Sequence, residues 1–467
     1  SCGDAPWIGT RWSSCWARNH PTGWARGGYH RDVTRLSALL AVAALAGGPL
    51  AGAGARPAPP EVVAAPDGLA FALALGGGGQ VLASGPYLLR VPGAEGPLRL
   101  EMARLAVDGA RLRGELRLSN DSGSLLSGLE LDFRSVTPTV RAVPGRAAPE
   151  PLPLALPRPL SLGELLPGEA TPFVPFEIAP LPLGEDVTVV VLLGTVTGLA
   201  VSPPIAVEGA LRPTALDTDR SGRLYVATAG VGRVLRLTAA SAATPAEAAR
   251  PSAPPTGMAL RRRDHGLFVA TGGATVEVYR PGRTRPAALD AGRPVTLLRV
   301  DASGVLRAAS GNGVLAFDEA KAGPPRPLGP EGSEVLSFDA DARGRVRAVV
   351  RNGETRRVVA SEAAGASPVA AGRGPGADAL DAPRAVRFAA DGALWIAADG
   401  PTPESAVLTR FSPNGEPRGT LPRLGLALLL GKDEEAGVPP AVDLAPGPDG
   451  LLWVLLESGA LFGARPF

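Results

Sequence analysis

The stretch "DGALWIAADG" (residues 391–400) is repeated in altered form by "DGLLWVLLES" (residues 449–458). In both stretches an Asp-Gly turn leads into an apolar run that contains a tryptophan. An Asp-Gly pair is a strong hairpin signal, because glycine readily adopts the positive φ that a tight turn requires. The two stretches therefore predict the same strand in two copies of one structural unit.

Four earlier segments follow the same pattern of apolar strand, polar turn ending in glycine, second apolar strand, gap and third strand. The turn glycines are Gly222, Gly266, Gly304, Gly344, Gly392 and Gly450, spaced by 44, 38, 40, 48 and 58 residues. A repeat of about 40–50 residues with three or four strands per unit is typical of a β-propeller. The second strands ("LYVAT", "LFVAT", "LWIAA", "LWVLL") are apolar throughout, as expected of blades packed between neighbours. We expect Trp395 and Trp453 to pack between blades.

Six units predict a six-bladed propeller over residues 205–467. The last unit offers only three strands before Phe467. Because an open edge strand invites aggregation, we expect the ring to be closed by a strand from elsewhere. The segment "PIAVEGA" (residues 204–210) is the predicted fourth strand of the last blade.

Residues 84–204 have a different pattern, with alternating apolar and polar runs such as "ARLRGELRLSND" and "DVTVVVLLGTVTG" separated by turns. Several strands at this spacing favour an immunoglobulin-like sandwich, similar to the accessory domains of secreted bacterial proteins. Residues 56–83, with "GGGG" at 76–79, are expected to form a linker or else a first irregular strand. The predicted fold class is thus all-β: an immunoglobulin-like β-sandwich followed by a six-bladed β-propeller.

The first 55 residues differ in composition from the rest, since they hold both cysteines, four of six tryptophans and two of three histidines. Residues 33–55 have a basic start, an apolar run and an Ala-Gly-Ala end, which is the pattern of a secretory signal peptide. The alternative is an N-terminal core helix, which Gly47, Gly48 and Pro49 would interrupt. We expect residues 1–32 to be an extension from a wrongly assigned start, and the mature protein to be secreted or periplasmic, without a stable membrane anchor.

Residues 56–467 keep 42 basic and 43 acidic side chains, because five arginines and two aspartates precede residue 56. A nearly neutral chain of this kind lacks the electrostatic footprint of a nucleic-acid-binding protein. This part has no cysteine and one histidine, His265, so thiolate and histidine-rich metal sites are not expected. Nearly all its basic residues are arginine, which suggests a GC-rich bacterial genome.

The repeated D-G-x-L-W/Y-V-A signature resembles the six-bladed propellers of the NHL-repeat, gluconolactonase-like and streptogramin-lyase-like superfamily. The resemblance covers about residues 205–467. It implies a divalent cation at the channel mouth in the lactonase-like members, held by a glutamate, asparagines and an aspartate, and a histidine there in the lyase-like members. Among the segments that lead into the innermost strands, only Glu334 offers a carboxylate and none offers a histidine. The enzyme signatures therefore do not carry over.

No catalytic, cofactor-binding or metal-binding residue is predicted, although a divalent cation such as calcium stays open. The channel-mouth candidates are Thr214, Thr256, Glu334 and Arg384, and the last two could pair with each other.

Other candidate motifs have plain structural interpretations. "DTDRSG" (217–222) and "DADARG" (339–344) resemble the start of a calcium loop but are better explained as hairpin tips with solvated acids. His265 and "RRR" (261–263) are expected to form a solvated turn, with a general base and an anion site as the respective alternatives. The run "LGLALLLGKDEEAG" (424–437) is expected to be the outer strand of the fifth blade, or else a cap on one face.

Two functions remain. The first is a secreted or periplasmic binding or scaffold protein that engages a protein partner through propeller-face loops, since aromatic residues for a sugar-stacking platform are sparse. The second is a metal-dependent lactonase-like hydrolase or a lyase on the same propeller, which would need three or more convergent oxygen ligands. The sequence favours the first and leaves the oligomeric state undetermined.

Overall fold

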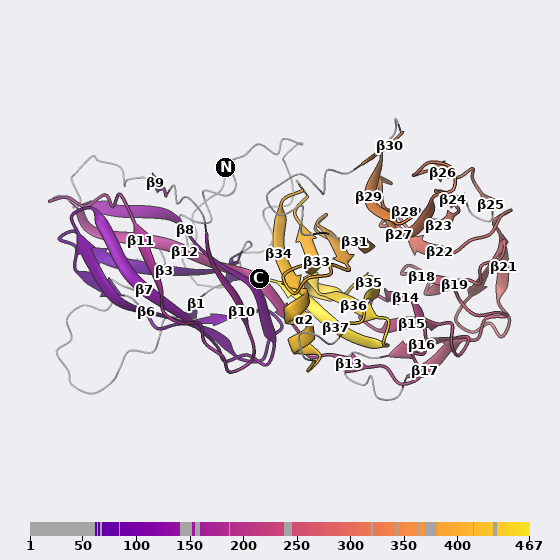
Figure 1. Cartoon of the computed structure of the whole chain (residues 1–467), viewed down its shortest axis with the longest axis horizontal. Coiled ribbons are helices and arrows are strands. Elements are labelled where there is room, and N and C mark those ends of the chain that lie inside the picture. The colour runs from indigo at the N-terminus through magenta and orange to yellow at the C-terminus, as the bar shows by residue number, and fades with distance from the viewer. Residues whose placement is uncertain are drawn as a thin grey trace, which may run out of the picture. The chain divides into compact units, whose positions relative to one another are not determined.

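The structure is a computed structural model. It describes residues 61–467 except 63, 66–67, 84, 141–151, 155–158, 186, 238–244, 319–320, 342, 363–364, 369–379, 381, 414 and 433–436. The predicted extension and signal peptide (1–55) lie outside the described residues. The described residues consist almost entirely of β-strands and form a sandwich followed by a propeller (Figure 1).

The first part of the chain is a two-layer β-sandwich. One sheet contains β1 (Glu61–Val62), β5 (Tyr87–Arg90), β6 (Pro97–Asp108), β7 (Arg111–Asn120) and β11 (Val174–Ile178). The other contains β2 (Ala64–Ala65), β3 (Gly68–Gly76), β4 (Val81–Ala83), β8 (Leu125–Val140), β9 (Leu152–Pro153), β10 (Leu160–Leu165) and β12 (Val187–Val201).

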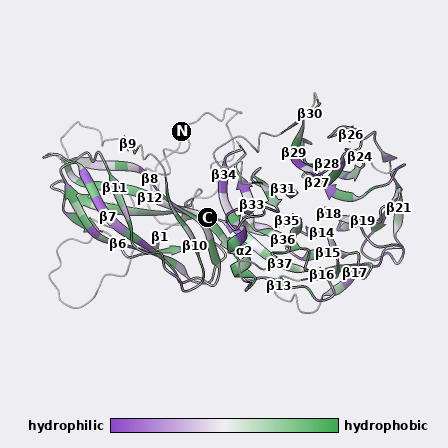
Figure 2. Ribbon diagram, viewed as in Figure 1, coloured by the Kyte–Doolittle hydropathy of each residue, from purple (hydrophilic) through white to green (hydrophobic). Residues whose placement is uncertain are grey.

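The two sheets enclose one apolar core in which aromatic rings from both layers meet. The Phe133 ring lies edge-on to Phe71 at 5.7 Å between centroids and is stacked with Phe176 at 5.4 Å. Along β7 buried residues alternate with more exposed ones, and Figure 2 shows both hydrophobic and hydrophilic residues on this strand. This alternation is expected of a sheet with one face on the core and one in water.

Residues 68–83 are not the predicted linker, because β3 and β4 lie there, which is closer to the alternative of a strand in this segment. β3 pairs with β12 from Leu69 to Gly76, opposite Val196 to Val189. The glycines at 76–79 include the hairpin turn that leads into β4 and do not mark the end of a domain. The apolar run "GLAFALALG" is therefore a sandwich strand whose partner lies more than a hundred residues later in the chain.

The second part of the chain is a β-propeller, with six groups of four antiparallel strands among the described residues. Blade 1 has β14 (Pro213–Thr218), β15 (Leu224–Thr228), β16 (Arg233–Leu237) and β17 (Ala246–Ala249); blade 2 has β18 (Gly257–Arg261), β19 (Gly266–Ala270), β20 (Thr275–Tyr279) and β21 (Ala287–Asp290); blade 3 has β22 (Leu297–Val300), β23 (Leu306–Ser310), β24 (Gly313–Asp318) and β26 (Arg326–Pro327), with β25 (Lys321–Ala322) bridging to β21. Blade 4 has β27 (Glu334–Ala340), β28 (Val346–Asn352), β29 (Thr355–Glu362) and β30 (Gly365–Pro368); blade 5 has β31 (Pro383–Phe388), β32 (Leu394–Ala398), β33 (Ala406–Phe411) and β34 (Pro417–Pro422); blade 6 has β35 (Ala441–Pro446), β36 (Leu452–Leu456), β37 (Ala460–Pro466) and β13 (Ile205–Ala206).

The ring is closed by the segment that precedes blade 1, as the sequence predicts. Ile205 and Ala206 of β13 pair with Leu461 and Ala460 of β37. The first strands of neighbouring blades contact one another around the ring, and β35 contacts β14 (Figure 1). The two second strands that contain tryptophan are β32 and β36. Trp395 in β32 is 1% exposed and Trp453 in β36 is 6% exposed.

The turn glycines adopt the expected positive φ in five of the six repeats, at Gly222, Gly304, Gly344, Gly392 and Gly450. Blade 2 differs, because its turn (262–265) is one residue shorter than the turn of blade 1 (219–223), and His265, with φ 55°, takes the left-handed position in place of Gly266. A histidine there is strained in a way that glycine is not. The pattern therefore located the turn in blade 2 but not the residue that carries its special conformation.

The apolar run after blade 5 is not an outer strand. β34 ends at Pro422 and residues Arg423–Leu429 form the short helix α2, in which Gly425, Leu426 and Ala427 are buried. Proline at the N-cap and the helix formers Leu and Ala suit this start. Among the described residues no helix is both long enough and apolar enough to cross a membrane.

The sandwich and the propeller share a sheet. The end of β12 pairs with β37, with Leu199 opposite Pro466 and Val201 opposite Ala464. Leu199 and Val201 also belong to a buried cluster that includes Trp395 of blade 5. Ser127 of β8 donates a hydrogen bond to the carbonyl of Thr420 in β34 at 2.9 Å. The two parts are therefore joined by main-chain pairing and by a continuous apolar core.

Substitution of turn glycines tests the backbone requirement. Gly304 has φ +87°, and an added Cβ would meet no atom within 4 Å beyond its chain neighbours, so Gly304→Ala should cost about 1 kcal/mol through backbone strain alone. Gly266→Ala is the matched control, because Gly266 lacks a positive φ and the closest contact of its Cβ would be the end of the Asp264 side chain at 3.2 Å. Thermal unfolding should show a lower midpoint for the first variant and little change for the second. Equal shifts of the unfolding midpoint in the two variants would show that the turn does not require a glycine with positive φ at position 304.

Candidate functional site

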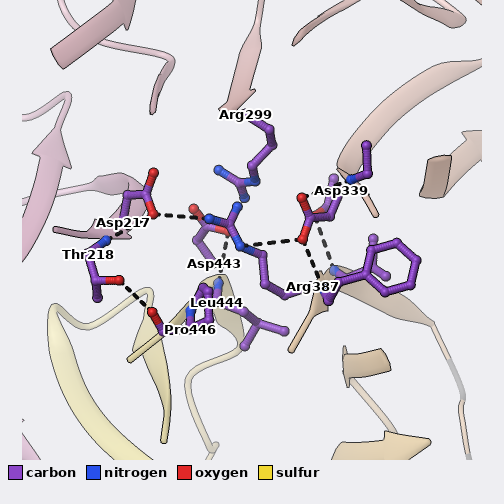
Figure 3. Close-up of polar contacts among 12 residues, drawn as sticks. Asp217, Thr218, Arg299, Asp339, Arg387, Asp443, Leu444 and Pro446 are labelled. Carbon is purple, nitrogen blue, oxygen red and sulfur yellow. Dashed lines mark hydrogen bonds and ion pairs between the residues drawn. The ribbon is translucent and has the colours of Figure 1, made fainter. Parts of the chain in front are cut away.

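The centre of the propeller holds five charged side chains in the innermost strands of five blades (Figure 3). Each of the five residues is at most 6% exposed. We call this set the channel network, and its members are Asp217 (β14), Arg299 (β22), Asp339 (β27), Arg387 (β31) and Asp443 (β35).

Ion pairs in the channel network cross the ring. Arg387 of blade 5 donates from Nη2 to Asp217 of blade 1 at 3.0 Å, and its Nε lies 3.6 Å from Asp339 of blade 4. Arg299 of blade 3 pairs with Asp443 of blade 6. Figure 3 shows both guanidinium groups directed toward the carboxylates at the centre. Charges this deeply buried are tolerated because each lies beside an opposite charge.

The three aspartates also join neighbouring blades through the main chain. Asp443 accepts the N–H of Leu216 at 2.8 Å, Asp217 accepts that of Leu260 at 2.9 Å, and Asp339 accepts that of Phe388 at 2.8 Å. Each carboxylate also accepts the N–H of the residue that follows it. Inner strands of different blades are not paired in a ladder, so these carboxylates satisfy edge N–H groups that would otherwise be buried without a partner.

Burial and charge act in opposite directions on the ionisation of the network. Burial raises the pKa of Asp339 above its ordinary value, although Arg387 and the N–H of Phe388 work against this. Burial alone would lower the pKa of Arg387, but attraction to Asp339, Asp217 and Asp443 raises it overall. Arg387 therefore stays charged, and its charge is what keeps nearby buried carboxylates tolerable.

The predicted channel-mouth candidates do not form one group. Thr214 bonds to the carbonyl of Pro255 at 3.0 Å and Thr256 to that of Ala270 at 3.3 Å, so both hydroxyls serve the main chain. Glu334 pairs with Arg351, and Arg384 pairs with Asp399 at 2.7 Å. The Glu334–Arg384 pair that the sequence allowed is therefore replaced by two separate pairs.

The two motifs that resembled calcium loops combine two roles. Their first residues, Asp217 and Asp339, belong to the channel network, which corrects their interpretation as solvated hairpin acids. Their third residues cap the hairpins: Asp219 accepts the N–H groups of Ser221 and Arg223 at 2.8 and 3.0 Å. In the part of the chain that the structure describes, no three metal-ligating side chains converge.

A regularity in the sequence could have revealed four members of the channel network. Asp217, Arg299, Asp339 and Arg387 each lie five residues before the turn glycine of their repeat. Charged residues of both signs at one fixed position of apolar inner strands are candidates for pairing across the ring, although Arg261 at the same position of blade 2 pairs with Asp264 in its own hairpin. Asp443 departs from this spacing because β35 and the turn that follows it differ from those of the other blades.

No known family model matches the chain, and no curated protein matches it. Among solved structures, a streptogramin B lyase is 10% identical and covers 58% of this chain and 98% of its own, with a TM-score of 0.40. The PQQ-bound aldose sugar dehydrogenase of Streptomyces coelicolor is 14% identical over 58% and 98% of the two chains, with a TM-score of 0.41. The Cps50 (Swd1) β-propeller domain of Myceliophteria thermophila is 13% identical over 56% and 99%, with a TM-score of 0.37. These similarities concern the propeller fold alone.

Removal of one buried arginine should destabilise the ring. Arg387→Met leaves Asp217 and Asp339 without their shared cation, which should cost about 3–5 kcal/mol. Arg384→Met is the control, since this residue lies three positions earlier on the same strand and its ion pair with Asp399 is about one third exposed. The free energy of unfolding of the control should fall by about 1 kcal/mol or less. Similar unfolding midpoints for the two variants would show that the channel network contributes nothing special.

The loss in Arg387→Met should depend on pH. Burial already raises the pKa of Asp339 and Arg387 works against this, so without the arginine the folded-state pKa of this carboxyl rises further above its unfolded value and the folded state prefers its protonated form. Stability is then regained as pH falls through the folded pKa toward the unfolded one. The difference in unfolding midpoint between the native protein and Arg387→Met should therefore shrink between pH 7 and pH 5. A difference that stays constant or grows would contradict this account.

Proposed function

We propose that this chain is a secreted or periplasmic binding or scaffold protein that engages a protein partner through loops on the faces of its propeller. The observation that carries the proposal is the channel network. The charged groups at the centre of the ring bind one another and the main chain, so the residues that could have handled a substrate there serve to hold the blades together. Function then belongs to the loops, where binding residues are commonly found on rigid scaffolds.

The strands of each blade alternate in direction, so loops emerge from two opposite faces. Face 1 carries the hairpins between the first and second strands, such as the one that contains Arg263. Face 2 carries the hairpins between the second and third strands, such as the one that contains Glu354. Both residues are exposed, and each tip is supported by a paired strand on either side.

The remaining parts of the proposal rest on the sequence. Secretion rests on the signal-like residues 33–55, and membership of the NHL-repeat, gluconolactonase-like and streptogramin-lyase-like superfamily rests on the repeat signature. We also infer that the sandwich is an immunoglobulin-like accessory domain. The pairing of the sandwich strand β12 with β37 of blade 6 supports a role for the sandwich in orienting the propeller.

Photo-crosslinking tests the use of the faces. A photoreactive residue at Arg263 reports on face 1 and one at Glu354 reports on face 2, while one at Arg104, an exposed arginine of the sandwich, is the control. In cells that naturally contain the protein, a discrete protein adduct should form from at least one face and not from Arg104. Absence of any face-specific adduct would overturn the proposal. A calcium-dependent rise in unfolding midpoint, reversed by EDTA, would favour the metal-dependent alternative instead.

Secretion is tested by the N-terminus of exported protein. We expect material recovered from the periplasm or the medium to begin near Arg56, because cleavage follows the Ala53-Gly54-Ala55 end. N-terminal sequencing gives the answer directly. A mature N-terminus before residue 50, or retention of the chain in the cytoplasm, would contradict this part of the proposal.

A further inference from the structure

Five arginines lie on two neighbouring loops at one end of blade 2. We call them the blade-2 arginine patch: Arg262, Arg263, Arg280, Arg283 and Arg285. All five are exposed. The first two belong to the hairpin between β18 and β19, and the other three belong to the loop between β20 and β21.

Strand register places the two loops side by side on face 1. Leu267, just beyond the hairpin, pairs with Tyr279, which directly precedes Arg280. Attraction to Arg280 also contributes to lowering the pKa of Asp264 at the hairpin tip, after the larger effect of its hydrogen bond from Arg261. The two loops therefore form one surface.

Local structure orders the patch. Arg283 N–H donates to the carbonyl of Arg280 at 3.2 Å across Pro281 and Gly282, and Gly282 has φ +74°. Proline followed by a glycine with positive φ is the signature of a type II turn. In the hairpin, Arg262 donates to Thr218 and to the carbonyl of Pro446 at 3.0 and 3.1 Å, which fixes it against blades 1 and 6.

The positive charge of the patch is not neutralised within the described residues. Asp264 is the one acid of the two loops, and it is already bound in a two-point contact by Arg261, which lies outside the patch, at 2.7 and 3.0 Å. Arg263, Arg280, Arg283 and Arg285 make no ion pair in the described part of the chain. Such a concentration of like charge is unfavourable by itself and attracts an anionic partner.

Other hairpins of face 1 show which anion suits these arginines. Arg223 pairs with Asp219 at 2.6 Å, Arg307 with Asp301 at 2.8 Å, and Arg345 with Asp341 at 2.6 Å. The guanidinium group matches the planar carboxylate geometrically. The patch loops contain no Phe, Tyr or Trp on which the bases of a nucleic acid could stack.

We propose that the blade-2 arginine patch is the docking surface for an acidic segment of the protein partner, whose Asp and Glu side chains pair with these arginines as Asp219, Asp301 and Asp341 pair with Arg223, Arg307 and Arg345. This inference rests on the proposed function and names the chemistry of its partner. Contacts of this kind raise the rate of association and set specificity more than they add affinity, so binding should weaken as salt increases.

The test measures binding of a fluorescent peptide of about 12 residues, rich in Glu and Asp, to the full chain at low salt. The patch variant replaces Arg280, Arg283 and Arg285 by Ala. The control replaces three other exposed arginines, Arg236, Arg293 and Arg357, by Ala and so changes the net charge equally. We expect about tenfold weaker binding for the patch variant and little change for the control. All six side chains are exposed, so both variants should keep the native unfolding midpoint.

Several outcomes would overturn the inference. Equally weakened peptide binding in the patch and control variants would show that net charge, and not the patch, determines binding. Tighter binding of single-stranded DNA or of anionic lipid vesicles than of the peptide, lost in the patch variant, would assign the patch to another class of partner. A protein adduct from Glu354 but not from a photoreactive residue at Thr284, an exposed neighbour of Arg283 and Arg285 that is not itself in the patch, would leave the proposed function standing and remove this surface from it. Absence of adducts from both faces would instead remove the proposed function itself.

Discussion

The propeller depends on one constraint: the innermost strands of its blades converge without pairing, so their edge N–H groups are buried beside one another. Asp217, Asp339 and Asp443 satisfy such groups across blade boundaries. Three buried carboxylates would be costly alone, and Arg299 and Arg387 compensate them from other blades. Closure of the ring is therefore achieved by side chains at the centre as well as by the pairing of β13 with β37 at the rim.

Arginine–aspartate pairs occur both in the buried centre of the propeller and at its hairpin tips. Arginine and aspartate meet in the buried channel network, where they hold blades together, and again at the hairpin tips of face 1, where Asp219 and Asp341 order their own loops. Blade 2 is the exception, since its two loops carry more arginine than its single aspartate can neutralise. An excess of one charge in an otherwise balanced chain is the feature that points to a partner, and it lies on the surface, not in the channel.

The sandwich and blade 6 are connected by strand pairing. The 15-residue strand β12 serves as a central strand of the sandwich sheet and then as the neighbour of β37 in blade 6. Gly419 of β34 lies so close to Leu199 that an added Cβ would come within 2.9 Å of its side chain. Backbone and side chain therefore approach each other closely where β34 meets β12.

The sequence by itself determined the propeller, its repeat and its closing strand, because turn glycines such as Gly304 and apolar strands such as "LWIAA" are local features repeated in register. The local sequence pattern did not predict strand β3, because its partner β12 lies far along the chain. It did not predict helix α2 either, because an apolar run of this kind suits a helix or a strand equally. It also misplaced Asp217 and Asp339, which adjoin turns and look solvated. Only the closed ring brings Arg387 to Asp217 across 170 positions and Arg299 to Asp443 across 144, because burial and charge pairing at a common axis are properties of the assembled blades.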